Sequence, residues 1–208
     1  MSPAQLLARG VAELGLDLPQ DAQKTLLDFL RLLEKWNRVY NLTAVRGTER
    51  MVTHHLLDSL AVVPHLASGT ILDVGSGAGL PGIPLAVALP RSQVTLLEAN
   101  RKKCAFLQQA AIELGLDNVT VACERVEAFL PTRPYDAVIS RAFSDLAEFA
   151  AVAGRHVRDG GTLAAMKGVY PHDELTRLPA EFRLREVASL SVPGLNAERH
   201  LVLLEPLR

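Results

Sequence analysis

Hydrophobic residues recur at helical spacing through the first 66 residues of the chain. One apolar stripe, from Leu26 to Trp36, predicts an amphipathic helix that packs on a core. Trp36 and Tyr40 could instead stack on a base, but aromatic residues that continue such a stripe more often belong to the core. We therefore expect an N-terminal helical extension over residues 1–66. Its predicted helices are Pro3 to Leu14, Asp21 to Val39 and Glu49 to Leu66.

From Thr70 onward, short apolar runs alternate with helical segments, which predicts a parallel sheet covered on both faces. The tail differs, because Leu184 to Val192 and His200 to Leu204 flank a Pro-Gly-Leu-Asn turn that is typical of an antiparallel hairpin. The expected parallel strands are Thr70 to Val74, Val94 to Leu97, Val119 to Ala122, Ala137 to Ser140 and Thr162 to Met166, the last preceded by Gly160-Gly161. Helices are expected over Arg101 to Leu114 and from about Leu146 to Val157.

The loop after the first of these strands carries the strongest chemical signal. From Asp73 it reads DVGSGAGLPG, with Gly75, Gly77 and Gly79 at alternate positions. Glycine lets the backbone turn sharply and lie against a ligand. The next strand ends on Glu98, about 20 residues beyond the turn, where an acid can bind the hydroxyls of a ribose. A cofactor that contains a nucleoside is therefore expected here.

Asp73 helps to choose between cofactors. A buried acid would repel the pyrophosphate of a dinucleotide, whereas S-adenosylmethionine carries a cationic sulfonium and an ammonium. The strictly alternating glycines also depart from the dinucleotide fingerprint. We favour S-adenosylmethionine over a dinucleotide and over a plain turn. Five parallel strands and a hairpin agree with a class I S-adenosylmethionine-dependent methyltransferase, a Rossmann-like doubly wound α/β sheet, whose core would be residues 67–208 in one compact unit with the extension.

Composition limits the possible partners. The 208 residues are 49% hydrophobic, with a formal net charge of −1 and a pI near 6.6, so nucleic acid would have to bind a local basic patch. No signal peptide or membrane span is predicted, and a cytoplasmic location is expected. Cys104, expected in mid-helix, and Cys123, expected at a strand end, form neither a disulfide framework nor a metal motif. We interpret both as buried, inert thiols and expect no metal.

Several longer motifs resemble one family, from about residue 20 to the C-terminus. The most specific is the GLPGIP continuation of the glycine-rich loop. The chain is similar to the bacterial small-subunit ribosomal RNA guanine-N7 methyltransferases, called RsmG or GidB. The resemblance implies methylation of a guanosine, position 527, in the decoding-region loop of 16S rRNA. The motifs are Trp36 to Thr43, His55 to Leu60, Asp73 to Pro84, Ile139 to Phe143, Lys167-Gly168 and Glu198 to Leu201.

The resemblance also implies cofactor contacts at matching positions. After the third strand, Glu124 to Glu127 lies where an adenine edge would reach, and a backbone N–H and a carboxylate there can bind its ring nitrogen and amine. Glu127 could instead be a first-turn acid that stabilises a helix. The family motifs match Gly75, Leu80, Val126, Glu127 and Arg141, and the loop argument adds Asp73, Gly77, Gly79 and Glu98.

Methylation of guanine N7 needs no general base, because this nitrogen has a lone pair and no proton to lose. The site must align the reactants and exclude water, so no catalytic residue is predicted. His54 and His55 could either pack within the protein or contact the RNA backbone, and the sequence favours neither role. The cysteine of carbon-5 pyrimidine methylation and the Asn/Asp-Pro-Pro-aromatic motif of amino-group methylation are both absent from the fourth and fifth strands.

Arg141 could hold the carboxylate of the cofactor, face guanine O6, or pair with a neighbouring acid. Lys167, Arg199 and His200 are expected at the same rim and, with the basic run from Arg101 to Lys103, could bind phosphates. The expected partner is 16S rRNA within the small ribosomal subunit or its precursor, with no DNA and no membrane. A small-molecule methyltransferase, a non-catalytic assembly factor and a nicotinamide-dependent reductase remain alternatives.

Overall fold

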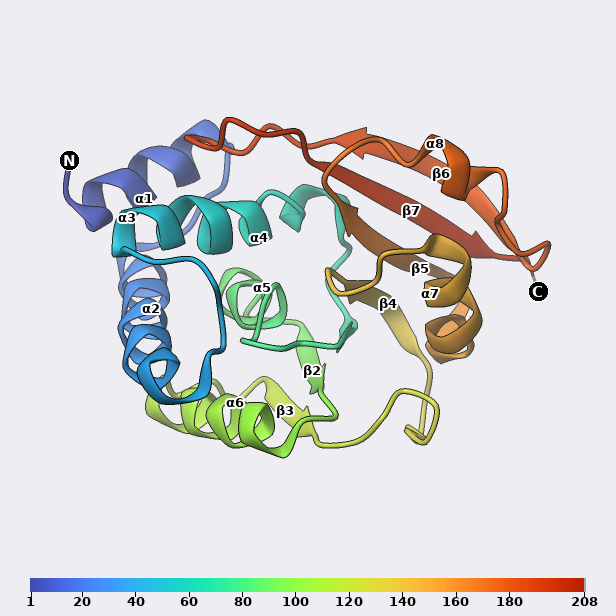
Figure 1. Cartoon of the computed structure of the whole chain (residues 1–208), viewed down its shortest axis with the longest axis horizontal. Coiled ribbons are helices and arrows are strands. Elements are labelled where there is room, and N and C mark those ends of the chain that lie inside the picture. The colour runs from blue at the N-terminus through green and yellow to red at the C-terminus, as the bar shows by residue number, and fades with distance from the viewer. Residues whose placement is uncertain (208) are drawn as a thin grey trace.

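In the computed structural model, which describes residues 1–207, a seven-stranded sheet has helices on both faces (Figure 1). The strand order is β3-β2-β1-β4-β5-β7-β6. Strands β1 to β5 pair in parallel, and β7 runs antiparallel to both β5 and β6. The predicted parallel sheet with a closing hairpin is confirmed. The strands are β1 Thr70–Val74, β2 Gln93–Leu97, β3 Val119–Ala122, β4 Tyr135–Ser140, β5 Val157–Lys167, β6 Phe182–Ser189 and β7 His200–Pro206.

The helices begin and end at recognisable signals. Helix α1 starts with a capping box, in which Ser2 and Gln5 satisfy each other's backbone N–H groups. Helix α2 ends at Asn41, which adopts a left-handed conformation with φ of 50°. Among the described residues, no helix combines the length and the apolar character that crossing a membrane would need. The longer helices are α1 Pro3–Glu13, α2 Gln20–Tyr40, α5 Gly82–Ala88, α6 Arg101–Glu113 and α7 Leu146–Ala153, and α8 is His172–Leu175.

The third predicted helix, Glu49 to Leu66, is not one regular helix. It consists of α3 (Thr48–Met51), a π-helical turn η1 (Val52–Leu57), α4 (Asp58–Leu60) and a 3₁₀ turn η2 (Val63–His65). Pro64 cannot donate the backbone hydrogen bond that would continue an α-helix, which accounts for the break before η2. Hydrophobic spacing carries no comparable signal for the π turn.

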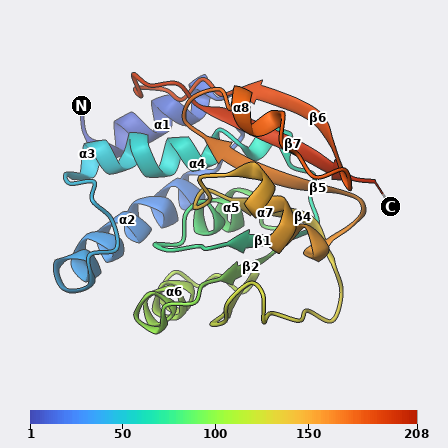
Figure 2. The same cartoon turned by 45° about the vertical axis from the view of Figure 1, so that its right-hand side comes forward.

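Side chains of the central strands alternate between two cores. Ile71 of β1 belongs to a cluster that α2, α5 and α6 cover, whereas its neighbour Leu72 faces the cluster that α7 covers. In the first cluster, Phe29 of α2 packs on Phe106 of α6 with ring centroids 6.3 Å apart. Trp36 also packs there, as its place in the apolar stripe predicts, while Tyr40 is 41% exposed. The N-terminal helices, blue to cyan in Figure 2, thus share a core with one face of the sheet.

Two glycines expected before the fifth strand lie inside it. Tyr135 pairs with Val157 and Ala137 pairs with Thr162, so the intervening residues of β5 form a bulge. Gly160 has a φ of 68°, which favours glycine at this point. The preceding helix correspondingly ends at Ala153 instead of near Val157.

The two cysteines form a disulfide, so the prediction of inert, unpaired thiols is wrong. Cys104 lies in the first turn of α6 and not in mid-helix, and Cys123 directly follows β3. Their Cα atoms are 5.8 Å apart because the start of α6 and the end of β3 meet at the same edge of the sheet. A separation of 19 residues does not reveal this proximity. The Cys104 sulfur also lies 3.2 Å from the carbonyl oxygen of Glu98.

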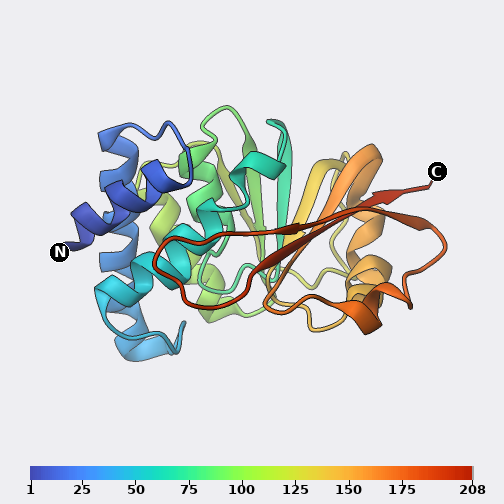
Figure 3. The same cartoon turned by 90° about the horizontal axis from the view of Figure 1, so that it is seen from above.

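The connection between β6 and β7 reaches back to the N-terminal helices (Figure 3). A Cβ built on Gly194 of this connection would lie only 3.0 Å from Thr53 Cγ2 of η1. Leu195 packs against the core that these helices share with the sheet. The N-terminal helices and the connection between β6 and β7 are therefore joined by packing.

We expect residues 1–66 and 67–208 to unfold as one unit because they share this core. Phe29→Ala should lower the free energy of unfolding by about 3–5 kcal/mol, the range for removing a buried phenylalanine. The exposed Ile112 on α6 provides a control, and its replacement by alanine should cost less than about 0.5 kcal/mol. Urea denaturation followed by circular dichroism and by Trp36 fluorescence would measure both. Two separate transitions would contradict a shared core.

Candidate active site

Three adjoining cavities lie along the carboxyl ends of the central strands. The acidic cavity, of about 410 Å³, is bounded by Gly75, Glu98 and the segment from Glu124 to Glu127. The loop cavity, of about 190 Å³, lies over the glycine-rich loop and shares Gly75 and Ala142 with the acidic cavity. The basic cavity, of about 380 Å³, shares Arg141 with the loop cavity. Its lining residues are Val45, His54, His55, Asp58, Arg141, Met166, Lys167, Gly168 and Arg199.

The glycine-rich loop turns tightly between β1 and α5. The N–H of Gly75 donates to the carbonyl of Leu97 at 2.9 Å, which ties the loop to the end of β2. A Cβ on Gly75 would lie 3.1 Å from the Cβ of Ala142, where the loop meets the segment after β4. Gly79 has a φ of 79°, and a Cβ there would lie 2.5 Å from Ile83 Cδ1. Both positions therefore require glycine.

Asp73 lies beneath this loop and lines none of the three cavities. Its side chain is 0% exposed, and Oδ2 accepts a hydrogen bond from the N–H of Gly82 at 3.0 Å. Oδ1 has no hydrogen-bond partner. Burial raises the pKa of Asp73 to about 7, against the opposing effects of the Gly82 hydrogen bond and the charge of Arg141. The structure thus places Asp73 as a support of the loop.

Glu98 lines the acidic cavity and also binds two backbone N–H groups beside it. Oε2 accepts from the N–H of Gly77 at 2.8 Å, and Oε1 accepts from the N–H of Asn100 at 2.8 Å. The carboxylate therefore connects the loop after β1 to the start of α6. Each carboxylate oxygen has a further lone pair, which leaves acceptor capacity for a ligand hydroxyl in the cavity.

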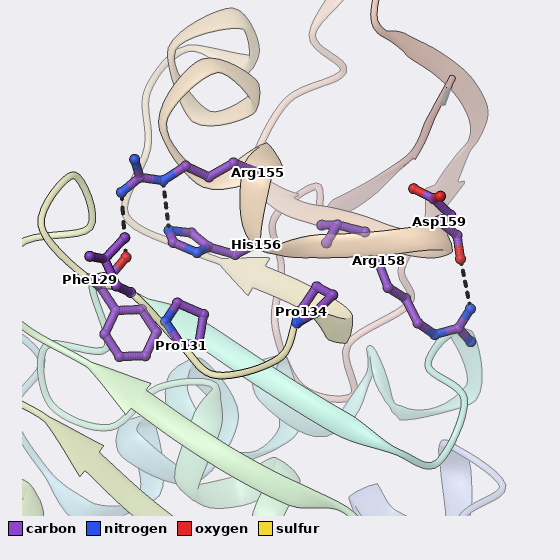
Figure 4. Close-up of a pocket in the computed structure, with 9 residues that line it drawn as sticks. Phe129, Pro131, Pro134, Arg155, His156, Arg158 and Asp159 are labelled. Atoms are coloured by element: carbon purple, nitrogen blue, oxygen red, sulfur yellow. Dashed lines mark hydrogen bonds between the residues drawn. The ribbon is translucent and has the colours of Figure 1, made fainter.

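Val126 and Glu127 line the acidic cavity, and their contact with adenine stays a prediction. No helix begins at Glu127 in the described structure, so the alternative reading of a first-turn acid is not supported. Arg155 holds this segment from behind, since its Nη2 donates to the carbonyls of Val126 at 2.9 Å and Glu127 at 2.6 Å. Figure 4 shows the guanidinium also bonded to His156 and to the carbonyl of Phe129.

A larger cavity, of about 590 Å³, lies at the amino ends of β4 and β5, away from the glycine-rich loop (Figure 4). Its arginines are occupied by the protein itself. Arg158 pairs with Asp136 at 2.6 Å and Arg155 binds backbone carbonyls. The hydrogen bonds from Thr70 and Arg158 lower the pKa of Asp136 to about 2. These contacts connect neighbouring segments of the protein and do not direct the arginine side chains into the cavity.

Arg141 and Arg199 meet at Asp58 in the wall of the basic cavity. Asp58 Oδ1 accepts from Nε of Arg199 at 2.8 Å, and Oδ2 lies 3.5 Å from Nη1 of Arg141. The alternative that Arg141 pairs with a neighbouring acid is therefore confirmed. Arg141 still lines both the loop cavity and the basic cavity, and its side chain is 31% exposed.

Lys167 and His200 lie close to this pair but are already bonded. Lys167 Nζ donates to Glu174 at 2.7 Å and to the carbonyl of Ser144 at 2.9 Å, which fixes the segment after β4. His200 Nδ1 lies 2.9 Å from the carbonyl oxygen of Gly168. Lys167 lines the basic cavity, whereas His200 does not.

The two histidines have different surroundings. His55 is buried, and its Nε2 lies 2.9 Å from Thr43 Oγ1. Burial and the nearby charge of Arg141 lower the pKa of His55 to about 4, so the ring is neutral at neutral pH. His54 is half-buried, with Nδ1 3.0 Å from the carbonyl oxygen of Arg50. Both line the basic cavity, and both are bonded within the N-terminal helices.

The acidic cavity fits adenosine better than a dinucleotide. Glu98, Glu124 and Glu127 line it, and a pyrophosphate would be repelled by these acids. Arg125 is the cation among its described lining residues, while the apolar surface for a purine comes from Val74, Leu97, Val126 and Phe143. The charges that could bind an anion lie instead in the basic cavity. The residues present therefore fit S-adenosylmethionine.

Solved structures share this fold. A SAM-dependent methyltransferase from Aquifex aeolicus superposes with a TM-score of 0.62 at 18% identity, over 83% of this chain and 98% of that one. TYW2 of M. jannaschii, solved in complex with AdoMet, superposes with a TM-score of 0.55 at 16% identity, over 72% and 74%. The chain therefore has the fold of the S-adenosylmethionine-dependent methyltransferases.

Sequence comparison narrows this class to one family. The model of the family described as GidB, rRNA small subunit methyltransferase G, matches residues 22–202. Ribosomal RNA small subunit methyltransferase G of Laribacter hongkongensis is 56% identical over 204 residues, 98% of this chain and 99% of that protein. The protein of the same name from Aromatoleum aromaticum is 58% identical over 207 residues, 97% and 98%. The chain belongs to the rRNA small subunit methyltransferase G family.

Sequence reasoning missed three residues that shape the site. Asp58 lies in the family motif from His55 to Leu60, but no role was predicted for it. An acid within an apolar helical segment nevertheless indicates a buried partner. Thr43 connects to His55 and lines the loop cavity. Arg155 binds the carbonyls of Val126 and Glu127, and nothing in the local sequence indicates this contact.

The raised pKa of Asp73 makes stability depend on pH. Between about pH 4 and pH 7 the native protein keeps a proton that the unfolded chain has lost, so the free energy of unfolding should fall as pH rises. Asp73→Asn removes this pH-dependent contribution to the free energy of unfolding. Its free energy of unfolding relative to the wild type should therefore rise by about 2–4 kcal/mol across the window.

Urea denaturation at pH 4.5 and 7.5 measures this difference. Asp136→Asn is the matched control, because the pKa of Asp136 is lowered to about 2 and the residue stays ionised throughout the window. The decrease in the free energy of unfolding that Asp136→Asn causes should be the same at both pH values. A pH-independent difference for Asp73→Asn would show that Asp73 is ionised in the native state.

Glu98 should govern cofactor affinity. Glu98→Gln removes the charge that strengthens bonds to ribose hydroxyls, and we expect S-adenosylmethionine to bind about 10- to 100-fold more weakly in calorimetry. Glu186→Gln, at an exposed position of β6, is the control and should bind as the wild type does. Unchanged affinity in Glu98→Gln would remove Glu98 from the cofactor site.

Proposed function

We propose that this protein transfers the methyl group of S-adenosylmethionine to N7 of a guanosine in 16S rRNA of the small ribosomal subunit, in the cytoplasm. The observation that carries the proposal is the basic cavity, which adjoins the cofactor cavities through Arg141. A target next to the methyl donor would meet Arg141, Lys167 and Arg199 there. The names of the family and of the relatives support small-subunit rRNA as the target class.

The cofactor would occupy two of the cavities. Val126 and Glu127 would contact the adenine, and Glu98 would bind the ribose in the acidic cavity. The turn from Gly75 to Leu80, with Arg141, would enclose the amino-acid end in the loop cavity. Bound there, S-adenosylmethionine would supply an electrophilic methyl group. The methyl group would lie near Arg141, where the loop cavity meets the basic cavity.

The residues of the basic cavity suit a nucleophile that needs no deprotonation. Burial lowers the pKa of His55 to about 4, which makes the ring a weak base, and its Nε2 already lies 2.9 Å from Thr43 Oγ1, so it is not positioned as a base. Guanine N7 attacks through its own lone pair, and the protein has to align it and exclude water. Methylation leaves a positive charge on the purine. The buried carboxylate of Asp58 offsets the neighbouring guanidinium charge, which reduces the repulsion that this product would meet.

The target is proposed to be a structured particle instead of a short RNA. A net charge of −1 gives no general attraction to phosphate, so affinity depends on the basic cavity and on the basic run from Arg101 to Lys103 at the start of α6. The small subunit or its precursor can present a folded loop to such a limited surface. Binding through this patch should weaken with added salt.

Methyl transfer can be tested directly. The protein is incubated with methyl-labelled S-adenosylmethionine and small subunits from a strain that lacks the modification, and the digested RNA is analysed by mass spectrometry. We expect N7-methylguanosine at one position of 16S rRNA, with much less label on a short hairpin oligonucleotide. Label in another nucleoside would refute the N7 assignment. Absence of label, with cofactor binding intact, would favour a non-catalytic role.

A further inference from the structure

Asp58 is a buried acid to which neither the family motifs nor the cofactor assigns a role. Its side chain is 3% exposed, and each of its oxygens faces a different arginine. Arg141 comes from the segment after β4, and Arg199 directly precedes β7, 141 residues from Asp58 along the chain. The acid thus joins three parts of the fold in the wall of one cavity.

The helix around Asp58 is irregular at this point. Asp58 directly follows the π-helical turn η1, which changes the direction in which successive side chains leave the helix. His54, His55 and Asp58 all line the basic cavity. Irregular turns of this kind occur often at functional sites.

The buried carboxylate of Asp58 is better explained by a role in orienting the two arginines than by a contribution to the stability of the fold. Removing a carboxylate from water costs free energy that its ion pairs largely offset, and apolar side chains often stabilise such a position as well. The acid, however, does what an apolar residue could not. It keeps two guanidinium groups side by side that would otherwise repel each other and turn toward solvent.

Both arginines retain donors for a ligand. A guanidinium has five N–H donors. Arg199 uses Nε on Asp58 and Nη1 on the carbonyl of Glu198, and Arg141 directs Nη1 toward Asp58. The remaining N–H groups belong to side chains that line the cavity, which suits the carbonyl and phosphate oxygens of a nucleotide.

We infer that Asp58 is a positioning residue that holds Arg141 and Arg199 in the wall of the basic cavity for the incoming nucleotide of the RNA substrate. The inference rests on the proposed function. Asp58 does not touch the reacting atoms and acts through the two arginines. Lys167 is held independently by Glu174, so loss of Asp58 should not release it.

Asp58→Asn tests the inference, because asparagine keeps the shape and removes the charge. We expect kcat/KM for undermethylated small subunits to fall at least about tenfold, as for loss of one partner of a buried charge pair. Because Arg141 also lines the loop cavity, the affinity for S-adenosylmethionine should fall as well, but by a smaller factor than kcat/KM. Asp28→Asn is the matched control, since Asp28 also binds two cations, Lys24 and Arg31, but on the surface of α2. It should methylate like the wild type.

A double-mutant cycle separates positioning from a merely structural role. If Asp58 acts through the arginines, Asp58→Asn should cost clearly less in an Arg199→Gln background than in the wild type. Equal costs in both backgrounds would overturn the inference, and so would wild-type kinetics of Asp58→Asn. An equal loss of cofactor affinity and methylation would assign Asp58 to general stability instead.

A measurement on the unaltered protein guards against a variant that does not fold. In ¹⁵N NMR spectra, Nε–H of Arg199, assigned by its loss in Arg199→Gln, should exchange slowly with water because it is bonded to Asp58. Fast exchange would overturn the inference. If the wild type methylates no rRNA, the proposed function fails, and the NMR signal alone decides whether Asp58 holds Arg199.

Discussion

Two buried acidic side chains hold the glycine-rich loop in place, and the rest of the site depends on them. Asp73 binds the N–H of Gly82 from below the loop, and Glu98 binds the N–H of Gly77 from the neighbouring strand. A loop rich in glycine makes few side-chain contacts of its own, so these hydrogen bonds help to fix its course over the ends of β1 and β2. The cofactor cavity is shaped by this loop.

Charge is separated along the edge of the sheet. Acids surround the space for a nucleoside, while Arg141, Lys167 and Arg199 surround the adjoining space. Each of these cations is paired with an acid, Asp58 or Glu174, which keeps it in the cavity wall. This arrangement lets a chain with a net charge of −1 present a local basic surface to a polyanion.

The N-terminal helices form part of the site as well as part of the core. Phe29 packs them against α6, and the turn η1 brings His55 and Asp58 to the cavity. The connection between β6 and β7 closes the same side and delivers Arg199. The N-terminal extension therefore forms part of the wall of the basic cavity.

The sequence by itself determined the alternating strands and helices, the closing hairpin and the glycine-rich turn, because these follow from local spacing and backbone preference. It also located Glu98, Val126 and Glu127, since residues that follow parallel strands meet at one edge. Only the tertiary structure decided that Asp73 lies under the loop, that Cys104 and Cys123 are joined, and that Asp58 binds two arginines. Such contacts join segments far apart in the chain, and their geometry depends on the packing of whole elements, which no local pattern encodes.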